Sequence, residues 1–141
     1  MKIGFTGTRV GMTEPQMETF EKLINCLMPT ELHQGCCLGS DEQAHYFCLE
    51  NNIWSMAHPP KSKFSAFEPI GAYKVYPEEE FIKRNHNIVL NTEALIAVSK
   101  TKEWELRSGT WATIRYAQKL GRPVHIIYPN GDTEILKTRK K

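Results

Sequence analysis

The sequence lacks the patterns that bind structural metal ions. Its four cysteines, Cys26, Cys36, Cys37 and Cys48, form no C-x-x-C pair, and there is no H-E-x-x-H motif. The adjacent Cys36 and Cys37 are poorly spaced to bind one tetrahedral metal ion. We therefore expect reduced thiols, no metal site and no bound cofactor.

Long apolar runs are also absent. No stretch approaches the roughly 18 apolar residues of a membrane span, and the first residues lack the apolar core of a signal peptide. The expected compartment is the cytoplasm, with no membrane partner.

The body of the chain has no excess of positive charge. The 141 residues carry a formal net charge of +2, but four of the 18 basic residues lie in the last five positions. This leaves 14 basic residues against 16 acidic residues in the rest of the chain. A general binder of the nucleic-acid backbone needs a basic face, so nucleic acid is not an expected partner. Length and composition predict one globular domain, residues 1–136, with a basic flexible tail, residues 137–141.

Short apolar runs alternate with amphipathic stretches along the whole chain. Strands are predicted at residues 2–6, 31–34, 53–58, 94–99 and 124–128, and residues 129–132 are predicted to turn the chain out of the sheet. Helices are predicted from Thr13 to Pro29, after Asp41, over 78–91 and over 108–120. The inner face of the 78–91 helix is expected to carry Phe81, Ile82, Asn85, Ile88 and Val89. This alternation predicts a three-layer α/β/α fold with five parallel strands.

Residues 61–77 show no clear periodicity. The segment nevertheless holds four aromatic residues, Phe64, Phe67, Tyr73 and Tyr76, which argues against disorder. Loops of this length in compact domains are usually functional. Two interpretations stand equally: a lid over a binding site, or a contact in a homodimer.

Small and polar residues follow three of the predicted strands. They are Gly7, Thr8 and Arg9; Gly39, Ser40 and Asp41; and Arg107, Ser108, Gly109 and Thr110. In a parallel sheet these loops share one edge, where glycines, helix N-termini, hydroxyls and guanidinium groups suit a phosphorylated small molecule. Any one loop alone has an ordinary structural explanation, and the G-x-G-x-x-G dinucleotide motif is absent. The three loops together predict a ligand site.

Three stretches of the chain resemble a known superfamily. Residues 35–45, GCCLGSDEQAH, are similar to the G-G-A-x-G-I-D-x-x-A-H stretch of the DNA-processing protein A (DprA/Smf) family, and residues 84–89, RNHNIV, to its R-N-R-I-I-A. Residues 108–124 resemble its S-G-(small)-x-x-T-A-x-x-A-x-x-x-G-R-x-V. These elements define the SLOG superfamily, which joins DprA with the LOG phosphoribohydrolases and nucleotide-sensing domains. The resemblance implies a Rossmann-like sheet of order 3-2-1-4-5 and a nucleotide pocket that includes Arg84 and Asn85. It also implies a dimer.

The chain departs from the LOG enzymes where their chemistry takes place. Arg84 matches the LOG arginine, but Thr113 replaces the glutamate that acts on the N-glycosidic bond. The catalytic residues are therefore unknown, and Glu105, Asp41 and Arg84 are weak candidates. His45, four residues after Asp41, is either its acid–base partner or a core residue. Trp104 and Trp111 are candidates for base stacking or packing.

Three functions remain open. The first is binding of a nucleotide or nucleotide-derived molecule by a sensor, carrier or sequestering protein, of a kind found among small bacterial and phage SLOG proteins. The second is a LOG-like hydrolase or transferase acting at the N-glycosidic bond of nucleoside monophosphates. The third, a DprA-like DNA-binding accessory protein, is disfavoured by the charge distribution.

Overall fold

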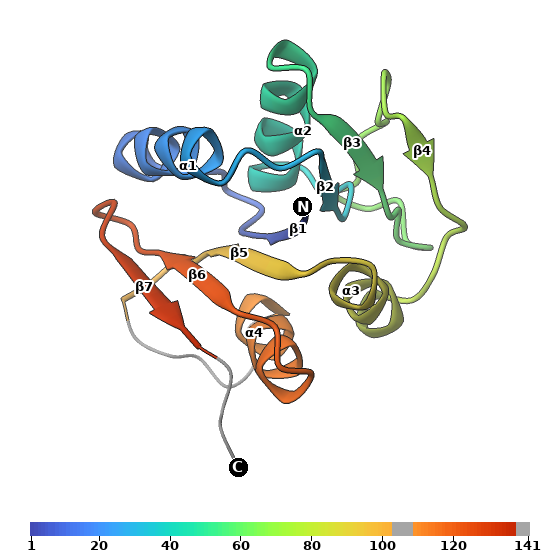
Figure 1. Cartoon of the computed structure of the whole chain (residues 1–141). Coiled ribbons are helices and arrows are strands. Elements are labelled where there is room, and N and C mark those ends of the chain that lie inside the picture. The colour runs from blue at the N-terminus through green and yellow to red at the C-terminus, as the bar shows by residue number, and fades with distance from the viewer. Residues whose placement is uncertain (103–108, 138–141) are drawn as a thin grey trace.

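A seven-stranded sheet forms the centre of the molecule (Figure 1). The computed structural model describes residues 1–102 and 109–137. The strands are β1 (Lys2–Thr6), β2 (Glu31–Gln34), β3 (Trp54–Ala57), β4 (Lys74–Val75), β5 (Ala94–Val98), β6 (Val124–Ile127) and β7 (Thr133–Leu136). Their order is β4-β3-β2-β1-β5-β6-β7, and all neighbours are parallel except β6 and β7. The five predicted strands occupy the centre in the predicted order.

The prediction of five strands was wrong at both edges. Residues 129–132 do not turn the chain out of the sheet, because they form a hairpin that returns it as antiparallel β7. Gly131 adopts a φ of 90°, and the amide of Tyr128 donates to the carbonyl of Asp132 over 2.8 Å. An Asn-Gly pair between two strands is a hairpin signal that outweighs the neighbouring proline. At the other edge, β4 lies inside the stretch expected to be irregular.

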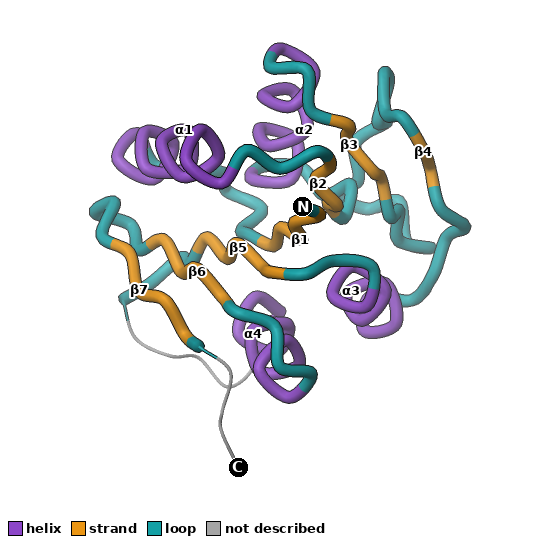
Figure 2. The backbone as a smooth tube through the Cα atoms, viewed as in Figure 1, coloured by secondary structure: helices purple, strands orange, loops and turns teal. Residues whose placement is uncertain are grey.

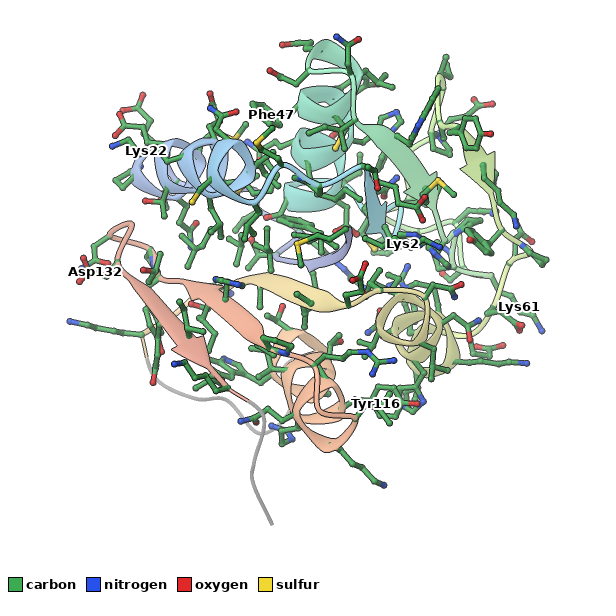
Figure 3. All side chains as sticks on the ribbon, viewed as in Figure 1. Lys2, Lys22, Phe47, Lys61, Tyr116 and Asp132 are labelled. Carbon is green, nitrogen blue, oxygen red and sulfur yellow. The ribbon has the colours of Figure 1, made fainter. Side chains whose placement is uncertain are left out.

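Helices cover both faces of the sheet. α1 (Glu14–Leu27) and α2 (Ser40–Glu50) lie on one side, and α3 (Phe81–Leu90) and α4 (Gly109–Lys119) on the other (Figure 2). Side chains fill both spaces between sheet and helices (Figure 3). Alternate residues of one strand therefore serve two cores: Ile96 packs towards α1 and α2, and Leu95 towards α3 and α4. Within the described residues, no helix is long and apolar enough to cross a bilayer.

The N-terminal end of α1 follows the sequence closely. Thr13 accepts a hydrogen bond from the amide of Gln16, and the Gln16 side chain accepts one from the amide of Thr13, which completes a capping box. The side-chain Nε2 of Gln16 also donates hydrogen bonds to the carbonyl oxygens of Ser99 and Ile127, 2.8 and 3.1 Å away. The cap therefore also fastens α1 to the carboxyl ends of β5 and β6.

The inner face of α3 differs from the prediction. Ile88 and Val89 are buried as expected, but Ile82 is 74 % exposed and Phe81 lies at the surface. The residue buried in the first turn is Arg84, which is 6 % exposed. The apolar period of a helix does not indicate a buried charged residue, because burying a charge is costly unless several partners surround it. The structure supplies those partners around the candidate site.

Candidate functional site

A cavity of about 420 Å³ opens at the carboxyl ends of β1, β2 and β5. Strand β1 lies between β2 and β5, so this is the point where the strand order reverses and where ligands bind in open α/β sheets. The volume suits a small-molecule ligand. The described lining residues are Phe5, Thr6, Gly7, Thr8, Arg9, Val10, Gly35, Cys37, Asp41, Phe81, Arg84, Asn85, Ile88, Lys100, Gly109 and Thr110.

Eight of the twelve residues expected to bind a ligand line this cavity. They are Gly7, Thr8, Arg9, Asp41, Arg84, Asn85, Gly109 and Thr110. Gly39 and Ser40 lie behind the lining, where they hold the loop after β1. The amide of Ser40 donates to the carbonyl of Thr8 over 2.9 Å, and the Ser40 hydroxyl accepts from the Thr8 amide over 3.2 Å. Arg107 and Ser108 lie outside the described residues, as do Glu105 and Trp104.

Gly39 fits the conformation required between these loops. Its φ of 93° lies in the left-handed region, and a Cβ there would lie 2.3 Å from the carbonyl oxygen of Arg9. Both features exclude other residue types without rearrangement. Gly39 was predicted to contact a ligand. In the structure its lack of a side chain allows the backbone before α2 to approach the backbone of the loop after β1.

The N-terminus of α4 forms one end of the cavity. Gly109 lines the cavity, and a Cβ built on it would have no neighbour within 4 Å among the residues that the structure describes. The Thr110 hydroxyl donates to the carbonyl of Gly7 over 3.2 Å, which joins the start of α4 to the loop after β1. The first amide groups of a helix lack partners within the helix and attract anions. This end of the cavity is therefore suited to a phosphate or carboxylate.

Arg84 is fixed by hydrogen bonds to surrounding oxygens. Its Nη1 donates to the carbonyl of Gly35 and to that of His58, the latter over 3.4 Å, and its Nε donates to Oδ1 of Asn85 over 2.8 Å. Among the described residues, Asn85 accepts its side-chain hydrogen bond from this guanidinium. A Cβ on Gly35 would lie 2.8 Å from Cζ of Arg84, so the guanidinium packs directly on that glycine.

The cavity is cationic although the body of the chain is slightly acidic. Arg9, Arg84 and Lys100 line it, and Asp41 is the sole carboxylate among its described lining residues. The ring of Phe81 lies near two of the cations, 5.8 Å from Cζ of Arg9 and 5.4 Å from Cζ of Arg84. This side of the cavity therefore offers flat apolar and guanidinium surfaces to a planar group.

Asp41 is buried, with 8 % of its surface exposed. Its Oδ2 accepts a hydrogen bond from the amide of Cys37 over 3.2 Å. Burial raises the pKa of Asp41 from its usual 3.8 to about 6, and the Arg84 charge and the amides of Cys37 and Gly35 oppose that rise. Burial thus outweighs the favourable groups. The carboxyl titrates close to neutral pH.

A second buried polar cluster supports the loop under Arg84. Nδ1 of His33 and Nε2 of His58 lie 2.7 Å apart, and Nε2 of His33 lies 2.7 Å from the Glu31 carboxylate. The Tyr76 ring stacks on His58 at 4.0 Å. Burial lowers the pKa of both histidines, that of His58 to about 3. Both imidazoles are therefore mainly neutral at pH 7. No motif or spacing in the sequence indicates that the two histidines meet.

Other candidates have structural roles. His45 is fully buried, with Nδ1 2.7 Å from the Ser55 hydroxyl and Nε2 2.9 Å from the carbonyl of Ile70, so it belongs to the core. Trp111 is 1 % exposed and packs in the core. The hydroxyl of Thr113 donates to the carbonyl of Gly109 over 2.8 Å within α4. No group of three or more possible metal ligands occurs among the residues described.

Sequence reasoning missed half of the lining. Five of the missed residues lie in or beside elements whose positions were predicted: Phe5, Thr6, Val10, Ile88 and Lys100. Gly35 and Cys37 belong to the stretch that carried the family resemblance. Phe81 was assigned to the core because it matches the apolar period of α3. No residue of 61–77 is among the described lining residues, so the lid interpretation has no support in this arrangement.

Comparison with known proteins identifies the fold alone. No protein-family model matches the chain, and no curated protein sequence matches it. The molybdenum cofactor binding protein from the phototrophic bacterium Rippkaea orientalis has a similar structure, with a TM-score of 0.68 and 20 % identity over 90 % of this chain and 76 % of that one. The structural-genomics protein TM1055 gives a TM-score of 0.60 and 18 % identity over 87 % of this chain and 71 % of that one. The chain has a Rossmann-like α/β fold.

Proposed function

We propose that this chain is a SLOG-type domain that binds a nucleotide or nucleotide-derived molecule in the cavity at the carboxyl edge of the sheet. It acts as a sensor, carrier or sequestering protein. The observation that carries the proposal is the convergence of the α4 N-terminus with Arg9, Arg84 and Lys100 around a cavity of about 420 Å³. The name of the similarly folded protein from Rippkaea orientalis, a molybdenum cofactor binding protein, supports small-molecule binding by a chain of this fold.

The anionic group of the ligand binds at Gly109 and Thr110. Their amides begin α4, and Arg9 and Lys100 add positive charge from the loops after β1 and β5. No described residue lies within 4 Å of a Cβ built on Gly109, which leaves room for a phosphate on the described side of the cavity. Arg84 contributes charge from α3, where its hydrogen bonds to Gly35 and Asn85 keep it in place.

Substitution at Gly109 tests the proposal. Gly109→Asp places a carboxylate at the anion site, in space that is free, and Gly109→Asn adds the same shape without charge. Titration calorimetry with nucleoside 5′-monophosphates and the matching nucleosides compares both variants with the wild type. We expect the Asp variant to lose at least about tenfold more affinity for monophosphates than the Asn variant, with no such difference for nucleosides. Equal affinities of the two variants would place the anion elsewhere.

A second candidate function, hydrolysis of an N-glycosidic bond, is favoured by one observation. Asp41 and Arg84 line the same cavity, and the pKa of Asp41 lies near the range of a general acid or base. Liquid chromatography of nucleoside monophosphates incubated with the protein tests it, with release of free base as the readout.

Self-association as a dimer is also proposed. Within 61–77, Phe64 is 80 % exposed and Tyr73 is 64 % exposed, and the Tyr73 ring lies 4.3 Å from that of Trp54, itself 55 % exposed. Apolar surface of this kind usually marks a contact. Sedimentation velocity at micromolar concentrations measures whether species of twice the monomer mass form.

A further inference from the structure

Asp41 carries a charge that its structural role does not require. Its carboxylate accepts the amide of Cys37 and thereby orders the loop that follows β2. An asparagine oxygen in the same place would accept that hydrogen bond without the cost of a buried negative charge. Asp41 is also not the N-cap of α2, since that position is Gly39. The loop therefore does not explain the charge, whereas hydrogen-bond donors of a ligand in the cavity would.

Arg84 favours the Asp41 charge electrostatically, but its hydrogen bonds go to other groups. Its guanidinium donates to the carbonyls of Gly35 and His58 and to Asn85, and no ion pair joins it to Asp41 in the part of the chain that the structure describes. The Asp41 carboxylate accepts the amide of Cys37, and the amide of Gly35 also favours its charged form. A carboxylate has about four acceptor positions, so acceptor capacity is left on a group that lines the cavity.

Asp41 and the α4 N-terminus line the cavity from segments that follow different strands. Asp41 follows β2 and Gly109 follows β5, and both strands pair with β1. Neighbouring strands are about 4.8 Å apart, so the carboxyl ends of β2 and β5, on either side of β1, are separated by roughly 10 Å. A nucleoside monophosphate is long enough to place its phosphate at Gly109 and the edge of its base at Asp41. Phe81 lines the cavity as an aromatic wall for the base.

We propose that Asp41 is the specificity-determining residue of the site and accepts two adjacent N–H donors from the ligand's base, a ring N–H and an exocyclic amino group. This inference rests on the proposed nucleotide-binding function. Guanine presents this pair of donors, and so does a pterin. Adenine and cytosine place a ring nitrogen lone pair beside the amino group, which a carboxylate repels. Uracil places its single ring N–H between two carbonyls. The ligand class is therefore a guanine nucleotide or a pterin phosphate.

The charge state of Asp41 provides an independent readout. The groups that face it are the Arg84 guanidinium from α3 and the thiols of Cys36 and Cys37. Burial raises the pKa of both thiols, that of Cys36 to about 12, so they remain protonated near neutral pH. Asp41 is thus the group of this set that changes charge between pH 5 and pH 8. Once protonated it donates one hydrogen bond, which suits adenine better than guanine.

Titration calorimetry tests the inference with guanosine, inosine and adenosine 5′-monophosphates and with neopterin monophosphate. At pH 7.5 we expect the wild type to bind the guanine nucleotide about tenfold or more tightly than the adenine nucleotide. Inosine monophosphate, which lacks the exocyclic amino group, should lie between them. Lowering the pH to 5 should reduce the ratio of the affinities for the guanine and adenine nucleotides. The ratio of the guanine and neopterin affinities distinguishes the two ligand sources.

Asp41→Asn should narrow the guanine preference to within about threefold at pH 7.5. Glu42→Gln is the matched control, because it removes one negative charge from the same turn of α2 at a residue that does not line the cavity. Wild-type protein that binds guanine and adenine nucleotides equally, or an Asn variant that keeps the preference, would overturn the role of Asp41 alone. Absence of binding to every phosphorylated probe would overturn the proposed function as well. The wild-type base series and its pH dependence need no variant to fold.

Discussion

Neutralising Asp41 should make the folded protein more stable at neutral pH. Burial raises the pKa of this carboxyl from 3.8 to about 6 in the folded state. The folded chain therefore binds this proton more tightly than the unfolded chain, and the wild type loses stability as the pH rises from about 4 to about 6. A shift of about two units corresponds to roughly 3 kcal/mol as an upper bound. Asp41→Asn should recover about 1–3 kcal/mol above pH 7, because the amide oxygen still accepts the Cys37 amide.

Urea unfolding at a series of pH values measures this difference. The free energy of unfolding of Asp41→Asn minus that of the wild type should be near zero or negative at pH 4 and should rise between pH 4 and pH 7. Glu42→Gln removes a charge from the same helical turn and controls for the helix dipole. A difference that is negative at every pH would show that Asp41 stabilises the fold as an anion. The account of Asp41 as a buried charge that costs stability would then be wrong.

Four further outcomes are expected. Gly35→Ala should destabilise the fold by about 1–3 kcal/mol in thermal unfolding, because its Cβ would lie 2.8 Å from Cζ of Arg84. His58→Gln should reduce the loss of stability on acidification below about pH 6.5, since the pKa of His58 is lowered to about 3 and the unfolded chain takes up that proton first. Release of free base from nucleoside monophosphates should be slow or absent, and rapid release that disappears in Glu105→Gln would assign the acid–base role to Glu105. Sedimentation should show a dimer, and replacing exposed Phe64 with Ser should weaken it.

The central fold could be predicted because its signals are local. The capping box at Thr13 and the continuous apolar strand at Ala94–Val98 are fixed by neighbouring residues, and the structure confirms both. The edges were harder to predict. β4 has two residues and depends on pairing with β3, and β7 depends on a turn beside a proline. Neither has enough apolar periodicity to indicate a strand by itself.

Sequence alone indicated the loops that line the cavity, and the family resemblance added Arg84 and Asn85, but the packing of the first turn of α3 was not predictable. The loops after β1 and β5 were identified because glycine and hydroxyl residues stand out in sequence. On α3 the burial of two residues differs from the apolar pattern: the apolar Phe81 lies at the surface, and the charged Arg84 is buried. Their placement depends on the carbonyls of Gly35 and His58, which come from two other strand ends. No spacing rule along one helix contains that information.

The two functions proposed for this cavity, base recognition and N-glycosidic hydrolysis, both depend on Asp41 but require it to do different things. In the resemblance to LOG enzymes, Thr113 takes the place of their glutamate, and its hydroxyl donates to the carbonyl of Gly109, so it offers no acid–base group. Among the described lining residues this leaves Asp41 as the carboxylate able to move a proton. A carboxylate engaged by two N–H donors of a base is not free to activate water at the sugar. If Asp41→Asn lowers guanine preference without changing base release, the cavity is a recognition site. If it abolishes base release and leaves the preference unchanged, Asp41 is the acid–base residue and recognition must come from other groups.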